Sequence, residues 1–586
     1  MKMVRSLLLG SAAGFVAVAG AQAADMPVKA KPVEYVKICS LYGAGFYYLP
    51  GTDICVKHGA YVRSQWYYGA GASPTNGPFI GASGQNSQFF NQPNDLVSRA
   101  RSIYTLDART QTEYGTLRAY VLIGFTQDWP GNSVAGGSAA AIYATRGFIQ
   151  FAGFTLGKAT SFYDIWSVPA NSYFAVWSSD TGDAGQILAA YTFQFGNGFS
   201  ATLAVEDPRR NTVTNATLGV GVAGAVGGAP VNLPTTRTDM TTAFLVGAAT
   251  APDQGQVKWP DIVANLRVDQ AWGSFQVMGA LHDASGGYWT AQPGSNNCFG
   301  TVFSSSLNGQ LACGHPDDEL GWAVGVGGIF KVPMPGGLTD VASFQVNYTE
   351  GATRYVVNTQ PGAGNPNYFS GSAAACNSPT VTGTVVTGFV TLPCLGSLGL
   401  GYWSDGIYGN PSVPGNPGPV AGYDGSIQKT KAWGVNAAWD HLWTTNLKTS
   451  VYGAFIHFDY NAVATALIGS NICLANQPLV IPVGQGSPRA VGTSLVNLTN
   501  CNPDFSVWMV GSRTQWNITP SFYVGFDVMY QKLETAFAGF GNYAAGAGLP
   551  RPGGAAGGVG NFGSGYEIKD QDTVSVTARA HWDILP

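Results

Sequence analysis

Residues 97–125 alternate between polar and apolar side chains, as expected for β-strands, whose successive side chains point to opposite faces. A tight turn is predicted at Tyr114-Gly115, which makes the stretch a hairpin of two long strands. The first strand gathers polar side chains on one face: Arg99, Arg101, Thr105, Asp107, Arg109, Gln111 and Glu113. The second strand carries an apolar face: Leu117, Ala119, Val121, Ile123 and Phe125.

Two structures fit this hairpin. In a soluble sandwich the charged face is wet and the apolar face is core. In an outer-membrane barrel the charged face lines a water-filled lumen and the apolar face meets lipid. Strands of globular proteins have about five or six residues, whereas a tilted membrane-spanning strand needs about nine to eleven. The length of these strands favours the barrel.

The rest of the chain repeats a unit of strand, tight turn, strand and long loop, with Gly, Asn and Pro at the turns. Counting the hairpin as two, the pattern predicts sixteen strands, and short and long connections alternate, as in bacterial barrels. We therefore expect an all-β fold, a 16-stranded antiparallel transmembrane β-barrel with short periplasmic turns and long extracellular loops. The other predicted strands are 56–68, two within 143–162 that meet near Gly153, 186–195, 199–206, 260–271, 274–283, 319–331, 339–350, 429–442, 447–459, 505–518, 521–534 and 571–584.

Composition and the N-terminal residues agree with an exported β-protein. Residues 1–23 are predicted to be a secretory signal peptide, with Lys2 and Arg5 before an apolar stretch and Ala21-Gln22-Ala23 as the cleavage site. No other apolar run is long enough for a membrane helix. Charged residues are 11% of the chain, against about 25% in an average soluble domain. The formal net charge of −4 argues against nucleic acid as a partner.

Eight cysteines in an exported chain imply disulfides, and none has the C-x-x-C spacing of zinc sites. Pairing between neighbours along the chain is one hypothesis among the 105 possible pairings. It would place three disulfides each within one long loop. The neighbouring pairs are Cys39/Cys55, Cys298/Cys313, Cys376/Cys394 and Cys473/Cys501.

Two stretches resemble the general porins of alphaproteobacterial outer membranes: Tyr35-Val-Lys-Ile-Cys39 through Cys55, and Arg146-Gly-Phe-Ile-Gln-Phe-Ala-Gly-Phe-Thr155. The resemblance implies a homotrimer in outer-membrane lipid, through which small hydrophilic solutes and ions diffuse passively. It also implies that the third extracellular loop, Asp164 to Gly185, folds into the lumen and narrows it. Residues 24–586 would then form the barrel, with 24–55 as a periplasmic N-terminal segment.

A pore acts on its solutes through the charges at its narrowest point. We expect an arginine side and an acidic side to face each other across this constriction, although several of these residues could simply solvate the lumen or pair with one another. The candidates are Arg63, Arg99, Arg101, Arg118 and Arg146 from the wall, and Asp164, Asp180 and Asp183 from the third loop.

No enzyme is expected, because the six scattered histidines have neither a nucleophile motif nor metal-ligand spacing. No cofactor and no metal are expected either. Two alternatives to a general diffusion porin remain open. One is a substrate-selective channel for sugars or nucleosides, which the aromatic third loop could serve. The other is a non-conducting surface β-protein, such as an adhesin or glycan binder.

Overall fold

The computed structural model divides the chain into two compact units, residues 1–56 and 57–586, which are treated separately. The predicted signal peptide and residues 24–37 lie outside the described residues. The structure describes residues 38–69, 96–129, 139–174, 177–182, 185–208, 213–216, 258–287, 289, 297–298, 301–302, 314–358, 368–370, 375–382, 385–393, 396–412, 420–472, 495–542 and 565–585.

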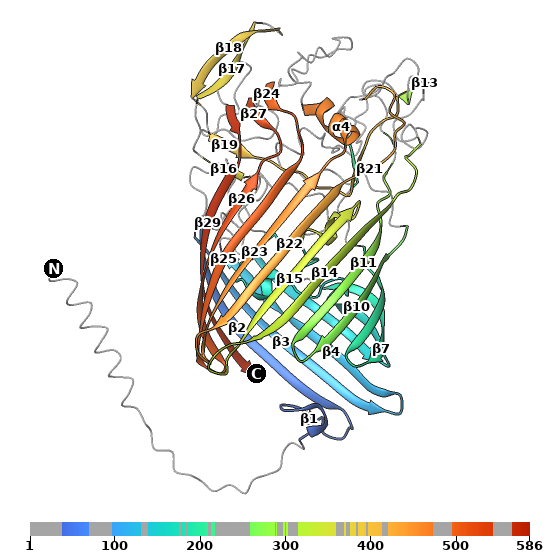
Figure 1. The fold of residues 1–586 in the computed structure, drawn as a ribbon, viewed down its shortest axis with the longest axis vertical. Helices are drawn as coiled ribbons and strands as arrows, with labels where there is room; N and C mark the ends of the chain where they lie inside the picture. Colours follow the sequence, from blue (N-terminus) through green and yellow to red (C-terminus); the bar gives the residue numbers. More distant parts are fainter. Residues whose placement is uncertain are drawn as a thin grey trace, which may run out of the picture. The chain divides into compact units, whose positions relative to one another are not determined.

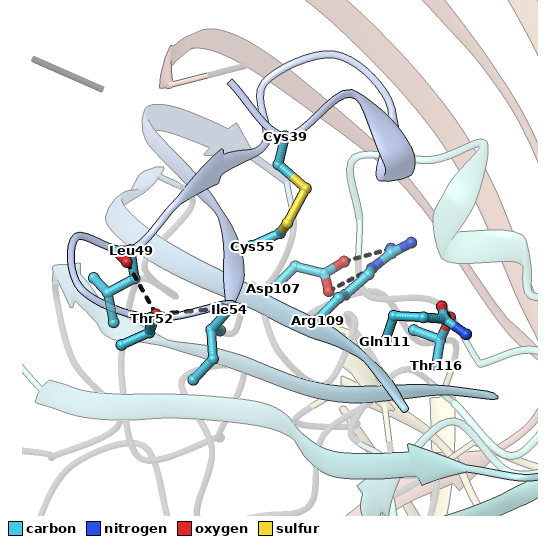
Figure 2. The surroundings of a disulfide bond; sticks show 9 residues. All are labelled: Cys39, Leu49, Thr52, Ile54, Cys55, Asp107, Arg109, Gln111 and Thr116. Atoms are coloured by element: carbon cyan, nitrogen blue, oxygen red, sulfur yellow. Dashed lines mark hydrogen bonds and ion pairs between the residues drawn. A yellow bond between two sulfur atoms is a disulfide. The ribbon is translucent and has the colours of Figure 1, made fainter. Parts of the chain in front are cut away.

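The first unit is a small excursion closed by a disulfide between Cys39 and Cys55 (Figure 2), whose Cα atoms are 6.0 Å apart. It contains a 3₁₀ helix, η1 (Ser40–Tyr42), the short strand β1 (Tyr47–Tyr48) and the start of β2 (Cys55–Tyr68). The turn between β1 and β2 is fixed by Thr52, whose hydroxyl donates to the Leu49 carbonyl 2.9 Å away. The predicted Cys39–Cys55 pairing is confirmed.

The other cysteine pairs are only partly covered by the described residues. Cys501 is disulfide-bonded, and its predicted partner Cys473 lies outside the described residues. Cys313 and Cys394 also lie outside them. The pairings Cys298/Cys313, Cys376/Cys394 and Cys473/Cys501 therefore stay predictions.

In the described part of the chain, sixteen strands form a closed antiparallel barrel, in which each strand pairs with its neighbour along the chain and the last strand, β29, pairs with β2 (Figure 1). The predicted barrel is confirmed. The hairpin turn at 113–114 lies one residue earlier than expected, since Thr112 pairs with Gly115. Besides β2, the strands are β3 (Leu96–Thr112), β4 (Gly115–Trp129), β5 (Ala139–Phe151), β6 (Phe154–Ala159), β7 (Gln186–Gly196), β8 (Phe199–Glu206), β10 (Asp261–Gln270), β11 (Gly273–Asp283), β14 (Leu320–Pro333), β15 (Thr339–Glu350), β22 (Lys431–Leu442), β23 (Leu447–Asp459), β25 (Phe505–Thr519), β26 (Phe522–Glu534) and β29 (Gln571–Leu585).

The two faces of the sheet reverse the arrangement of a water-soluble protein. Apolar side chains are exposed on the outer face, as shown by Leu266 at 63% and its cross-strand neighbour Val277 at 49%. Polar side chains fill the inner face, where they are buried. These include Gln65, Gln276, Gln345, Asn347, Asn436, Ser450, Asp527 and Thr577. This distribution is expected of a barrel with lipid outside and water inside.

The long connections contain structure that the period-two pattern did not predict. Figure 1 shows α4 (Ala462–Ile472), β24 (Leu495–Asn500) and β27 (Ala538–Asn542) at the end of the barrel away from the short turns. Among the described residues, no helix is long and apolar enough to cross a membrane. The remaining elements are β9 (Val213–Asn215), β12 (Asn297–Cys298), β13 (Thr301–Val302), β16 (Tyr368–Ser370), β17 (Ala375–Thr382), β18 (Val385–Pro393), β19 (Gly396–Gly399), β20 (Gly406–Tyr408), β21 (Gln428–Lys429), β28 (Gly565–Ile568), η2 (Val168–Ala170) and η3 (Thr353–Tyr355).

A hydrophobic core lies among these loops rather than between sheets. Trp177 of the third loop packs there with loop residues Trp403 and Val356 and with Leu467 of α4. The rings of Trp177 and Trp403 meet edge to face, 5.3 Å between centroids. The long loops are thus packed together as one apolar cluster.

A buried polar network ties two of these loops to the barrel. Nδ1 of His282, at the end of β11, lies 2.6 Å from Oδ1 of Asp261, and Nε2 lies 3.3 Å from Oδ2 of Asp405 in the loop after β19. Asp405 also accepts a hydrogen bond from the Thr353 N–H, 2.8 Å away. Tyr355 donates its hydroxyl to Asp261. Because all five side chains are buried, the network fixes where η3 and residues 400–408 lie.

Candidate pore constriction

Residues 160–182, between β6 and β7, leave the wall that they come from and bond to strands far along the chain. At the start of this third loop, the side-chain oxygen of Gln345 on β15 accepts the N–H of Ile165, 3.2 Å away. The amide nitrogen of Gln345 donates to Oδ1 of Asp164 at 2.9 Å. One glutamine of the wall thus holds both the backbone and the carboxylate of the loop.

The middle of the loop is held by charged residues of the wall. Asp527 on β26 accepts the Tyr173 N–H at 2.6 Å and the Ser172 hydroxyl at 3.1 Å. Arg513 on β25 donates Nη1 to the Ala170 carbonyl at 2.9 Å. Asp440 on β22 accepts from the side-chain amide of Asn171 at 2.7 Å. These bonds span more than 250 residues of sequence, so the loop crosses to the opposite wall.

The loop returns along β15 and β22, where two asparagines hold Ser179. Its N–H donates to Oδ1 of Asn436 at 2.7 Å, and its carbonyl accepts from Nδ2 of Asn347 at 2.6 Å. Asn436 also donates to Oδ2 of Asp180 at 3.1 Å. The loop therefore replaces water as the hydrogen-bond partner of the polar wall.

Glycines within the facing strands make room for the loop. A Cβ atom at Gly525 would lie 2.1 Å from the hydroxyl oxygen of Tyr173, and one at Gly434 would lie 2.6 Å from Oγ of Ser179. At Gly327 it would lie 2.5 Å from Ile165. A glycine inside a strand often marks such a close approach. Glycines inside the strands are thus the local signal in the sequence for the path of the loop.

Two of the predicted acidic residues, Asp164 and Asp180, form a close pair at the two ends of the loop. Burial and the neighbouring Asp180 raise the pKa of Asp164 to about 7, against hydrogen bonds that lower it. Burial also raises the pKa of Asp180, which accepts from the Ser178 hydroxyl at 2.6 Å and from the Gly182 N–H at 2.8 Å. Asp183, the third predicted acid, lies outside the described residues.

The predicted arginines of the hairpin are bound to their own sheet. Arg99 forms an ion pair with Asp128, 2.6 Å between Nε and Oδ1. Nε of Arg101 donates to the Thr126 hydroxyl at 2.7 Å. Both arginines are buried, which leaves little of either guanidinium in contact with the lumen.

Arg118 shares Asp107 with Arg109, at 2.9 Å and 2.7 Å from Oδ2 (the Arg109 pair is drawn in Figure 2). Its guanidinium also lies 5.2 Å from the ring centre of Tyr120 and 5.5 Å from that of Phe148. These two rings stack on each other, 5.4 Å apart. Arg118 thus borders an aromatic surface of the inner wall.

A cavity of about 700 Å³ lies between the start of the loop and the inner wall, where β2, β4 to β8, β10 and β11 contribute lining residues. Of the eight predicted residues, Arg146 and Asp164 line it. Two charged residues that the sequence reasoning missed, Arg267 and Asp269 on β10, line it as well; they pair with each other at 2.8 Å. Arg267 and Asp269 stand two residues apart in the predicted strand 260–271, and this spacing indicated that both lie on one face of the strand. Arg63 is not among the lining residues, but its guanidinium lies beside Tyr61, which lines the cavity.

Comparison with known proteins places this geometry in a family. The chain is 32% identical over 213 residues to porin Omp2b of Brucella melitensis and to porin Omp2b of Brucella suis. The match covers 35% of this chain and about half, 54%, of the length of these relatives.

Solved structures with a similar path of the chain include the outer membrane channel DcaP of Acinetobacter baumannii and an anion-selective porin from Comamonas acidovorans. The first is 12% identical with a TM-score of 0.46, over 92% of this chain and 99% of DcaP. The second is 9% identical with a TM-score of 0.35, over 91% of this chain and 99% of that porin.

The model of the porin subfamily matches residues 25–577 of this chain. The chain therefore belongs to this family of outer-membrane β-barrels.

Proposed function

We propose that the protein is an outer-membrane porin that lets small hydrophilic solutes and ions diffuse passively through a water-filled channel. The observation that carries this proposal is the third loop, which is hydrogen-bonded across a polar lumen to the opposite wall. A loop that merely capped a solid core would have no reason to meet a wall of buried glutamine, asparagine and aspartate. A loop that sets an aperture needs such anchors, because its position defines the size of the opening.

Arg146 and Asp164 are the proposed charges at this aperture. Both line the 700 Å³ cavity, one from the wall and one from the loop. Opposite charges on two sides of an opening orient dipolar solutes and bias ion passage. Arg118 is a further positive charge at the edge of the aperture, where its guanidinium lies beside the stacked rings of Tyr120 and Phe148. Arg99 and Arg101 are assigned to the wall, because their guanidinium groups are buried against Asp128 and Thr126.

Several features of the outer surface support a membrane location. Exposed tryptophans near strand ends, among them Trp129, Trp259, Trp443 and Trp516, suit the interfacial girdles of membrane barrels. We further propose a homotrimer, with an apolar groove of about 500 Å³ on the outside of β7 to β11 as a contact between copies. Residues 1–23 are proposed to be the signal peptide, and residues 24–55 to lie in the periplasm.

Membership of the porin subfamily supports a channel rather than an enzyme, and conductance is the property to measure. Purified, folded protein would be added to a planar lipid bilayer in KCl. Stepwise current increases with three coupled sublevels are expected from a trimeric porin. Block of that current by one sugar or nucleoside at low concentration would identify a selective channel instead. Absence of current from folded protein would overturn the proposal in favour of a surface-binding role.

A further inference from the structure

Three neighbouring strands carry a row of stacked rings on the inner wall of the barrel. Tyr523 on β26 is paired with His581 on β29, and His581 is paired with Arg63 on β2. The ring of His581 lies between two tyrosine rings, 4.7 Å from Tyr523 and 4.5 Å from Tyr61. The row meets the 700 Å³ cavity of Arg146 and Asp164 at Tyr61. His581 and Tyr523 do not line that cavity, and the proposed function does not use them.

Two arginines border the row, and neither has an acidic partner among the described residues. Arg579 stands two residues before His581 on β29. Its guanidinium carbon lies 3.8 Å from the ring centre of Tyr173, and Nη2 donates to the Tyr173 carbonyl at 3.3 Å. The guanidinium carbon of Arg63 lies 5.7 Å from the ring centre of Tyr61. With two guanidinium groups and no acidic partner for either within the described residues, the patch carries excess positive charge.

Three nitrogen atoms of this patch have no hydrogen-bond partner within the described part of the chain. They are Nε of Arg63, Nε of Arg579 and Nδ1 of His581. The residue His581 is 8% exposed, and Nε2, the other nitrogen of its ring, lies 3.0 Å from Asp583. Buried nitrogen atoms without a partner are costly and rare in folded proteins. The two arginine Nε–H groups are donors, and Nδ1 of His581 becomes one when the ring is protonated. Their concentration at one positively charged place points to a ligand with several acceptor oxygens.

We propose that Arg63, Arg579 and His581 form a binding site for small oxyanions, namely carboxylates and phosphates, on the wall of the channel. Guanidinium groups match oxyanions because their N–H donors form a planar fork. Protonation of His581, which a bound anion favours, would turn Nδ1 into a further donor. This inference rests on the proposed channel function for access to the lumen, and it names the class of solute that the channel would retain.

The test compares block of the channel by inorganic phosphate, in a KCl background, in the parent protein and in three variants. Arg63→Gln removes the charge, and Arg63→Lys keeps the charge but loses the fork. Arg267→Gln is the matched control, because Arg267 also lines the lumen but is paired with Asp269. Arg63 is chosen over Arg579 because it does not hold the third loop, so the variants are expected to fold.

We expect saturable block of the parent and of Arg267→Gln, and roughly tenfold weaker block of Arg63→Gln, as for loss of one charge-assisted hydrogen bond. Arg63→Lys should fall between them. Equal block of all four proteins, or no saturable block of a conducting parent, would overturn the site. Calorimetric binding of phosphate to the folded protein in detergent needs no current. Binding that depends on Arg63 in a protein without conductance would keep the site and overturn the channel function.

Discussion

The carboxylate of Asp527, on the barrel wall, accepts the backbone N–H of Tyr173 in the third loop at a distance of 2.6 Å. It accepts the hydroxyl of Tyr452 from the neighbouring wall as well, at 2.7 Å. Asp527 is therefore a junction between two strands and the loop, and it is buried. The position of the aperture depends on such junctions more than on the loop's own sequence.

Replacing Asp527 with alanine should loosen the third loop without opening the barrel. The change leaves the Ser172 hydroxyl, the Tyr173 N–H and the Tyr452 hydroxyl without their acceptor, at a cost of about 1–3 kcal/mol for each group that stays buried. Single-channel recordings should show larger and noisier current. Asp317→Ala, at an exposed loop position, is the control. Parent-like current in Asp527→Ala would contradict the anchoring role.

The third loop should become less stable as the pH rises. The pKa of Asp164 is about 7 in the folded protein, against an ordinary value of 3.8. The folded state therefore binds this proton more tightly than the unfolded state does. The stability that it contributes is fully present below about pH 4 and is lost as the pH rises through 7.

Asp164→Asn cannot ionise, so it isolates this effect. Urea unfolding of both proteins should give similar free energies at about pH 4, and an increasing advantage of the variant towards about pH 8. A difference between the two proteins that stays constant with pH would show that Asp164 is not protonated more tightly in the fold.

Breaking the His282 network should free two outer loops. His282→Ala leaves the buried Asp261 and Asp405 facing each other without the ring between them. Loss of one member of such a buried pair costs about 3–5 kcal/mol. Limited proteolysis should then cut within residues 351–358 and 400–412 faster than in the parent. His457→Ala is the control, since Nδ1 of His457 lies 2.9 Å from the Ser506 hydroxyl and the ring has no acidic partner in the described part of the chain. It should leave the cleavage rate nearly unchanged.

An arginine on the outer face should impair membrane insertion. Val451 on β23 is 52% exposed, and a cation at this kind of position costs about 2–4 kcal/mol near the bilayer midplane. We expect Val451→Arg to lower the yield of folded protein in lipid vesicles, while Val451→Leu retains it. Equal folding yields of the two variants would place this face in water and not in lipid.

The barrel could be predicted because the sequence features that specify it are local. Alternation along each strand identifies the inner and outer faces, and each short turn fixes a register. Pairing of Thr112 with Gly115 is enough to bring Arg99 opposite Asp128 and Arg101 opposite Thr126. The turn predicted from the sequence, at Tyr114-Gly115, lies one residue later and gives a different register, so these two pairings could not be predicted from it.

The constriction itself could be predicted only in part, because its contacts are long-range. Nothing near Tyr173 in the sequence indicates that Asp527 will bind it, 354 residues later. The same holds for Gln345 and Asp164, and for Asn436 and Ser179. Short strands in the long loops were missed because a few residues are too short a window for a period of two to emerge.

The order of these contacts along the chain has a consequence for how the channel is made. The third loop is synthesised early, yet the residues that hold it follow at 345, 436, 513, 527 and 579. Its final position is therefore reached only when the C-terminal strands arrive. Closure of the barrel and positioning of the loop that sets the opening are therefore one late event in biogenesis. A chain truncated before the last strands would have neither a closed barrel nor a positioned loop.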